Sequence, residues 1–145
     1  MGDAELTDQE QQARRDAVRD IFPQTPFIGL LGIEIDRYEP DDITMRVKFR
    51  HELTNDGKVY HGGVISSAID TAGALAAWSN HDFNKGARAA TVAINVQYLG
   101  AARESDLVCH AKAVKRGKEL IFTEIHATDD GGNPVAHGLQ TYRIV

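Results

Sequence analysis

The sequence predicts a single α+β domain in which antiparallel strands surround one long buried helix. The first observation is the length of 145 residues, which suits one domain with its own core. The second is the stretch 62–79, which is apolar almost all round, as in a buried helix. The third is the alternation of apolar and polar residues after position 90, which indicates several strands.

Composition narrows the possible partners. Lys and Arg total 16 against 21 Asp and Glu, and the resulting net charge of −5 argues against nucleic acid or an anionic membrane as partner. Cys109 is the only cysteine, so neither an intrachain disulfide nor a thiolate zinc cluster can form. The first 22 residues lack the apolar core of a signal peptide, and we therefore expect a cytoplasmic protein.

The N-terminal segment predicts an amphipathic surface helix over about 7–22. Thr7 followed by Glu10 is the pattern of a capping box, and apolar residues recur at helical spacing behind it. Pro23 is expected to end this helix, because proline cannot donate the next backbone hydrogen bond.

An antiparallel hairpin is expected next. The apolar run 27–32 is punctuated by glycine and is expected to be a turn that leads into a strand over 33–38. Asp41 and Asp42 mark a turn, and the alternation over 43–49 indicates a second strand with one solvated face.

The second half of the chain predicts four further strands separated by turns. The first of them alternates, with Val92, Ile94, Val96 and Tyr98 on one side. Cys109 lies on an apolar face and is interpreted as a packed core thiol. The expected strands are 91–99, 106–114, 120–128 and 135–145, and the expected turns are 115–118 and 129–134.

Asp70 is the only charged residue in the helix 62–79. Serines, glycines and this mid-segment carboxylate make the helix too polar for a transmembrane span. A carboxylate in a buried helix is costly unless it is paired or hydrogen-bonded. The residues one turn away are small and leave room for a ligand: Ser66, Ser67, Gly73 and Ala74. The alternative is that Asp70 caps another backbone segment or pairs with a distant arginine.

A polar loop over 55–63 runs directly into this helix. The start of a helix offers unpaired N–H groups, and glycines there let a substrate carbonyl approach the backbone, as an oxyanion site requires. Gly62 and Asp70 are separated by a little over two helical turns, about 12 Å of rise, so one chain does not bring both to the same carbonyl. Two copies related by a twofold axis could do so, which would place the active site between subunits.

These residues resemble a known family. His61-Gly62-Gly63 precedes an apolar helix with Asp70 eight residues after the first glycine. Further matching pieces follow the same order along the chain: Asn55, the Asp70-Thr71 pair, the strand 91–99 and the turn 116–118. The set resembles the hotdog-fold acyl-CoA thioesterases of the phenylacetate-pathway (PaaI-like) type. The resemblance covers about 27–145 and leaves 1–26 as an N-terminal helical extension.

The resemblance implies a five- to six-stranded antiparallel sheet around the central helix. It also implies a homo-oligomer, either a dimer or a dimer of dimers (a homotetramer), with the active site at the dimer interface, an acyl-CoA substrate and no cofactor. The implied catalytic residues are Asp70 as nucleophile or general base, Gly62 as oxyanion donor, and His61 and Asn55 as orienting groups. The expected substrate-binding residues are Gly63, Thr71, Thr91 and, for the coenzyme A phosphates, Arg116 and Lys118.

Functions other than acyl-CoA hydrolysis fit the sequence to different degrees. A hotdog-fold enoyl-thioester hydratase or dehydratase and a non-catalytic acyl-CoA-binding module remain alternatives. A serine hydrolase is disfavoured because no G-x-S-x-G motif surrounds Ser66 or Ser67. The six histidines show no metal-ligand spacing, so no metal site is expected. Space beside Gly73, Ala74 and Ala77 suits aryl or medium-length acyl groups alike, and Trp78 or the N-terminal helix could line or narrow the pocket.

Overall fold

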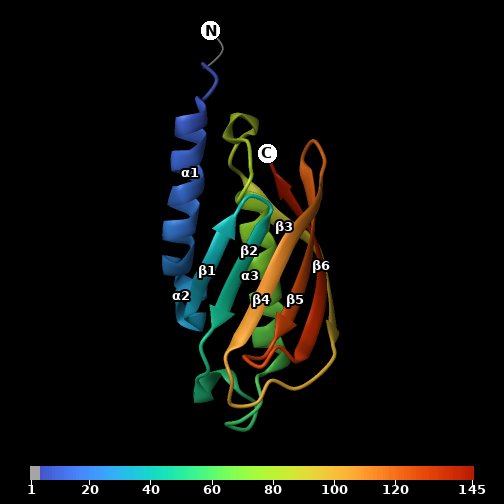
Figure 1. Cartoon of the computed structure of the whole chain (residues 1–145). Helices are drawn as coiled ribbons and strands as arrows, with labels where there is room; N and C mark the ends of the chain where they lie inside the picture. The colour runs from blue at the N-terminus through green and yellow to red at the C-terminus, as the bar shows by residue number, and fades with distance from the viewer. Residues whose placement is uncertain (1–3) are drawn as a thin grey trace.

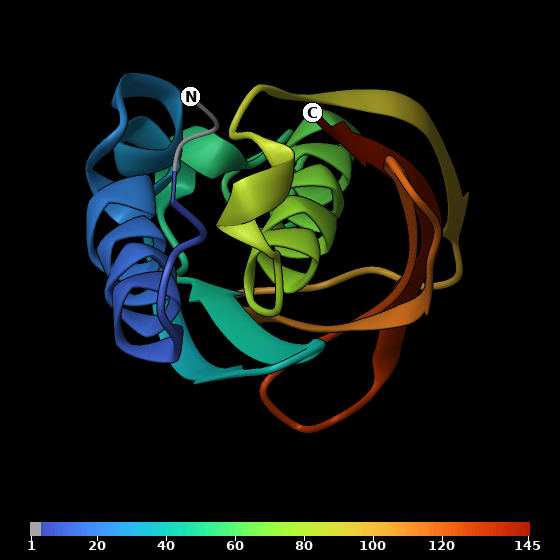
Figure 2. The same ribbon diagram turned by 90° about the horizontal axis from the view of Figure 1, so that it is seen from above.

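A computed structural model describes residues 4–145; residues 1–3 of the predicted extension lie outside the described part. Six strands form one sheet in the order β1-β2-β4-β5-β6-β3, and every neighbouring pair is antiparallel. The sheet curls around one long helix, α3 (Figures 1 and 2). The strands are β1 Ile33–Glu39, β2 Asp42–Val47, β3 Ala89–Tyr98, β4 Leu107–Arg116, β5 Leu120–Thr128 and β6 Pro134–Ile144. This architecture confirms the predicted α+β class and the antiparallel sheet wrapped around a central helix.

The core lies between α3 (Gly62–Trp78) and the concave face of the sheet. Helix and sheet approach closely at Gly138, where a Cβ would lie 2.3 Å from a methyl carbon of Ile69. Cys109 is fully buried as predicted, and burial raises the pKa of its thiol to about 12. Within residues 4–145, none of the helices has the length and apolar character needed to cross a membrane.

The N-terminal helix α1 (Asp8–Ile21) forms as expected and carries the predicted capping box. The backbone N–H of Glu10 donates to Thr7 Oγ1 at 3.2 Å, and the N–H of Thr7 donates to Glu10 Oε2 at 2.8 Å. A short 3-10 helix, η1 (Phe22–Gln24), contains Pro23 and follows directly. Figure 1 shows α1 beside β1, outside the curl of the sheet.

The segment expected as a turn over 27–32 is instead a short helix, α2 (Pro26–Leu31), so that prediction is wrong. Pro26 occupies the first helical turn, where its missing N–H costs nothing, and Gly32 ends the helix with a φ of 68°. The apolar run is therefore a short helix bounded by a proline and a glycine.

Several strand boundaries also differ from the prediction by one or two residues. β4 continues through Arg116, because Lys115 pairs with Phe122 and Arg116 pairs with Ile121. The turn expected over 115–118 is correspondingly shorter, and β2 ends at Val47 rather than at residue 49. Basic residues signal a turn only statistically, whereas cross-strand partners decide where a strand ends.

Arg116 anchors the C-terminal end of α3. Its Nη2 donates to the carbonyl oxygens of Ala76 at 3.1 Å and Ala77 at 2.8 Å, and its Nε donates to Asp41 at 2.6 Å. The last carbonyls of a helix lack intrahelical donors and carry partial negative charge, so a cation there is stabilising. The guanidinium expected to bind a phosphate is thus engaged within the fold.

We expect Arg116→Ala to lower the free energy of unfolding by about 1.5–3 kcal/mol, because charge-assisted bonds to the helix end are lost. Urea denaturation followed by circular dichroism measures the change. Lys118→Ala is the control, since Lys118 is exposed and we expect a change below about 0.5 kcal/mol. Equal losses in the two variants would contradict the anchoring role.

Candidate functional site

Asp70 lies midway along α3 and accepts hydrogen bonds from two uncharged side chains. Thr91 Oγ1 donates to Asp70 Oδ1 at 2.7 Å, and Gln140 Nε2 donates to the same oxygen at 2.7 Å. Within residues 4–145 the carboxylate forms no ion pair, and its Oδ2 accepts no hydrogen bond from the protein. One oxygen is therefore fixed in place while the other is free to act on a ligand.

A bulge in β3 explains how Thr91 reaches Asp70. The simple alternation predicted from the sequence places Thr91 on the opposite face from Ile94. The register between β3 and β6 shifts between Thr91 and Ala93, so Thr91 lies opposite Tyr142 and Ile94 lies opposite Gln140. Directly opposed residues share a face of the sheet, and the extra residue therefore turns Thr91 toward the helix.

Gln140 is a site residue that the sequence analysis missed. Its Nε2 donates to the backbone oxygen of Asp70 at 2.7 Å as well as to the carboxylate, and its Oε1 accepts from Thr123 Oγ1 at 3.2 Å. Gln140 is in phase with Gly138 and Tyr142 on the buried side of β6, which was the available signal. A buried amide in such a position needs partners, and Asp70 is one of them.

The small residue Gly73 makes room for Gln140 rather than for a substrate. A Cβ at this position would lie 2.3 Å from Gln140 Oε1. Ala77 is fully buried in the apolar cluster around Trp78. Of Gly73, Ala74 and Ala77, whose small side chains were expected to leave space for the acyl group, only Ala74 lines the Asp70 cavity.

A cavity of about 520 Å³ opens beside Asp70. One wall comes from α3 and β3, and the other comes from η1 and α2. Of the N-terminal helix expected over 7–22, only its last residue, Phe22, lines the cavity; α1 itself does not. Trp78 does not line it; its Nε1 donates to Tyr142 Oη at 3.3 Å in the neighbouring cluster. The lining is mostly apolar, and consists of Phe22, Thr25, Pro26, Phe27, Ile28, Ser67, Asp70, Thr71, Ala74, Thr91 and Tyr142.

The start of α3 holds a second group of predicted residues. His61 is the N-cap, and its Nδ1 accepts from the Gly63 N–H at 2.8 Å. The N–H of Gly62, in contrast, finds no acceptor among residues 4–145. Tyr98, expected from the sequence only as a strand residue, packs on Gly62 and donates to its carbonyl oxygen at 3.0 Å. A free N–H on a helix N-terminus is the donor that an oxyanion site needs.

The remaining predicted residues occupy three places. Thr71 lies at the Asp70 cavity, although its hydroxyl donates to the Ser67 carbonyl at 2.8 Å. Asn55 is exposed in the loop before α3, and its backbone N–H bonds to Val59 at 2.9 Å. Arg116 and Lys118 lie with the far, C-terminal end of the helix and line a small cleft there.

Gly62 and Asp70 are on one helix, separated by about 12 Å of rise. The structure therefore gathers Asp70, Thr71 and Thr91 at the cavity and His61, Gly62 and Gly63 at the helix start, in two separate groups. A thioester carbonyl bound at one group of a single chain lies beyond reach of the other.

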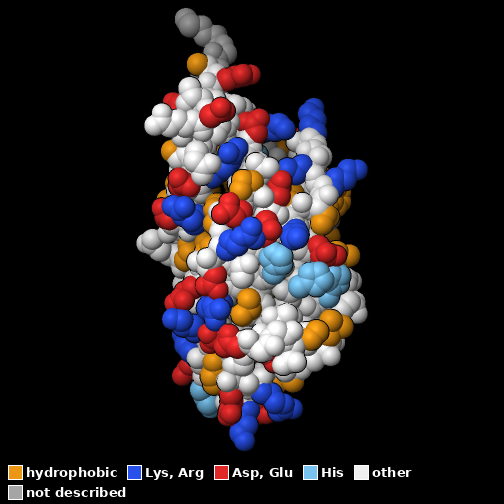
Figure 3. All heavy atoms as spheres, viewed as in Figure 1, with side chains coloured by type: hydrophobic (Ala, Val, Ile, Leu, Met, Phe, Trp, Pro, Cys, Tyr) orange, Lys and Arg blue, Asp and Glu red, His pale blue; other side chains and the backbone are white. Residues whose placement is uncertain are grey.

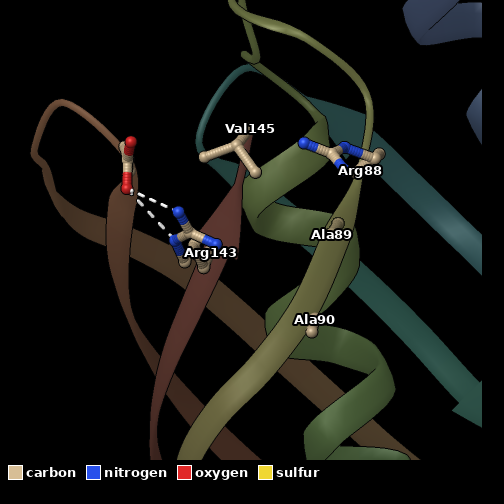
Figure 4. A pocket seen from close by; sticks show the side chains of 6 residues that line it. Arg88, Ala89, Ala90, Arg143 and Val145 are labelled. Carbon is tan, nitrogen blue, oxygen red and sulfur yellow. Dashed lines mark hydrogen bonds and ion pairs between the residues drawn. The ribbon is translucent and has the colours of Figure 1, made fainter.

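A second cavity, of about 410 Å³, lies at the end of the sheet where β3 begins. Arg88 and Arg143 line it, with Val145 between them (Figure 4). Arg143 forms an ion pair with Glu119 at 2.9 Å, whereas Arg88 forms none within residues 4–145. β3 contributes to both cavities: Ala90 lines this one, and the next residue, Thr91, lines the Asp70 cavity.

Comparison with known proteins identifies relatives of the whole domain. Residues 57–136 match the sequence profile described as "Thioesterase superfamily". Human acyl-coenzyme A thioesterase 13 is 27% identical over 136 residues, which are 92% of this chain and 95% of that protein. Zebrafish thioesterase superfamily member 2 has a TM-score of 0.78 at 25% identity, over 90% of this chain and 97% of that one. The PaaI protein of the E. coli phenylacetic acid degradation operon has a TM-score of 0.80 at 19% identity, over 92% and 94%.

Proposed function

Because the chain belongs to the thioesterase superfamily, we propose that it hydrolyses acyl-CoA thioesters to a free acid and coenzyme A. The observation that carries this proposal is the Asp70 carboxylate, whose Oδ1 is held by Thr91 and Gln140 beside a largely apolar cavity. The name of the human relative supports the choice of coenzyme A esters. The apolar cavity is suited to the acyl group.

Asp70 supplies the reactive oxygen in this proposal. Its Oδ2 either attacks the thioester carbonyl or removes a proton from the attacking water, and both routes need a charged carboxylate in a fixed orientation. Gln140 and Thr91 provide that orientation through neutral donors, which leave the negative charge available. The thiolate of coenzyme A leaves as the carbonyl re-forms and takes up a proton. In the nucleophilic route this leaves a mixed anhydride on Asp70, which water then hydrolyses to the free acid; in the general-base route the oxygen of the attacking water is already part of the free acid.

The oxyanion donor comes from a second copy of the chain. Within one chain, β3 runs past α3 so that Thr91 contacts Asp70 and Tyr98 contacts Gly62. An antiparallel pairing of β3 with β3 of another copy, centred near Asn95, sets Tyr98 of one chain opposite the Thr91–Val92 bulge of the other. Such a pairing brings the Gly62 N–H of the second copy toward Asp70, which no single chain achieves.

The exposed edge of β3 supports this association. Only β6 pairs with β3 among the described residues, so its other edge presents free backbone groups. None of its ten residues is charged, whereas four of the seven residues of the opposite edge strand β1 are charged. Apolar side chains along β3 are exposed, with Val92 at 57%, Ile94 at 40% and Tyr98 at 54%. An uncharged apolar edge of this length is suited to pairing with another strand.

A dimer of dimers is the assembly we propose beyond this pair. The outer face of the sheet carries the exposed side chains of Val114, Phe122 and Leu139 around a shallow apolar hollow. Burying such a surface between two dimers removes it from water.

Arg88 and Arg143 are suited to the phosphates of coenzyme A. Both line the cavity at the start of β3; Arg88 forms no ion pair within residues 4–145, whereas Arg143 is paired with Glu119. Arginine binds phosphate oxygens in paired hydrogen bonds. These two residues take the role first expected of Arg116, whose guanidinium anchors α3.

The test is release of free thiol from short, medium, long and aromatic acyl-CoA esters, read with a thiol-reactive dye. We expect turnover on at least one class, and a several-fold higher KM for the matching acyl-N-acetylcysteamine ester, which lacks phosphates. An enoyl-thioester absorbance change without thiol release would identify a hydratase or dehydratase. Binding without any turnover would indicate a non-catalytic acyl-CoA-binding module.

A further inference from the structure

Three histidines stand in one row across the outer face of the sheet. The strand register sets His110 of β4 opposite His126 of β5, and His126 opposite His137 of β6. The histidine side chains gather over this part of the sheet in Figure 3. They come from positions up to 27 residues apart in sequence, so no local sequence motif predicts this row.

Two of the three histidines face a common carboxylate. The Nε2 of His126 lies 3.3 Å from Glu124 Oε1, and the Nε2 of His137 lies 3.3 Å from Glu124 Oε2. One potential ligand atom from each of the three residues lies within 4.8 Å of the others. His110 faces away from this group, because its Nε2 contacts Asp42 Oδ1 at 2.7 Å.

The spacing of these atoms suits a small divalent cation. Ligand atoms about 2.0–2.1 Å from a tetrahedral zinc ion lie roughly 3.3 Å from one another, which matches both histidine–carboxylate distances. All three ligand atoms lie within 4.8 Å of one another, and both imidazoles are partly exposed, at 59% for His126 and 32% for His137. The backbone of the two paired strands already holds the three residues together.

The chemistry of the donor set selects the class of ion. Two imidazole nitrogens with one carboxylate oxygen suit zinc, nickel, cobalt or copper, whereas magnesium and calcium prefer oxygen alone.

We propose that Glu124, His126 and His137 form a binding site for a divalent transition-metal ion of the zinc class on the outer face of the sheet. The site lies across the sheet from Asp70, on outward-facing positions of β5 and β6. It is therefore separate from the thioester chemistry. A bound ion would link the two central strands β5 and β6 on their outer face. The proposal holds or fails independently of the hydrolytic function.

The test is titration of the metal-free full-length protein with Zn²⁺ by isothermal calorimetry, together with imidazole NMR spectra. We expect one ion per chain with a dissociation constant in the micromolar range, and shifts in the His126 and His137 signals. His126→Ala and His137→Ala should each weaken binding by at least about tenfold, since each removes one of three ligands. His110→Ala is the matched control, a neighbouring histidine on the same face, and should bind as the wild type does.

Two results would overturn the proposal. One is the absence of binding up to about millimolar Zn²⁺, which is weaker than any specific site of this donor set. The other is binding that the His126 and His137 variants leave unchanged, or that His110→Ala weakens equally, since the ion would then sit elsewhere.

Discussion

Replacing Asp70 by asparagine is expected to lower kcat/KM for acyl-CoA hydrolysis by roughly 10³-fold or more, while the protein stays folded and associated. Asparagine has the same shape, and its Oδ1 can still accept the hydrogen bonds from Thr91 and Gln140 at the present distances of 2.7 Å. The substitution replaces the free oxygen by an amide nitrogen, which neither attacks a carbonyl nor accepts a proton from water. Thiol release measured beside the wild type gives the ratio.

Matched measurements make this result interpretable. Asp8→Asn removes an exposed carboxylate in the first turn of α1 and should retain full activity. Thermal unfolding of Asp70→Asn should resemble that of the wild type, because no packing is lost. Turnover of Asp70→Asn close to that of the wild type would remove Asp70 from the catalytic role.

The second large effect is expected on the edge strand. The double variant Ala93→Lys/Asn95→Lys should dissociate the β3 pair and lower activity by at least about 10²-fold, the usual cost of losing one oxyanion donor. Both residues point away from α3, so Asp70 and its partners stay in place. In a pairing centred near Asn95 the two lysines introduced at 95 are directly opposed at the twofold axis, and those introduced at 93 lie diagonally beside them, which is destabilising for like charges.

Light scattering and thiol release test this prediction together. We expect light scattering to give a smaller molecular mass for the variant than for the wild type. Its circular dichroism spectrum should show the strand content of a folded protein. Glu39→Lys places a lysine on the opposite edge strand β1 and is the control, for which we expect unchanged mass and activity. A dissociated variant with full activity would show that one chain suffices for catalysis; an undissociated one would exclude pairing through β3.

Much of the fold could be predicted from the sequence. The capping box at Thr7, the apolar helix 62–79 and the alternating strands depend on residues a few positions apart, which periodicity and capping reveal directly. The helix at Pro26–Leu31 was missed because six residues are too few to distinguish a helix from a turn by periodicity. The end of β4 was missed because pairing with β5 outweighs the turn preference of Lys115 and Arg116.

The residues of the candidate site likewise divide into those that the local sequence indicates and those that only the fold brings together. Asp70 stands out because a lone charge in an apolar helix needs an explanation, and Gly62 stands out because it begins that helix. Gln140 lies 70 residues beyond Asp70, and nothing local to either residue indicates their contact. Thr91 was proposed from a resemblance, but only the bulge in β3 aims its hydroxyl at the carboxylate.

The sequence by itself determined the helices and most strands, the family resemblance and the residue on which the chemistry is proposed to depend. These follow from local periodicity, capping and residue type. Only the tertiary structure decided which side chains hold Asp70 and that the segment 22–28 lines its cavity. The tertiary structure alone also shows that Arg116 anchors α3 and that His126 and His137 face one carboxylate. The physical reason is register: a shift of one residue turns a strand's side chains to the other face, and register is fixed by partners distant in sequence.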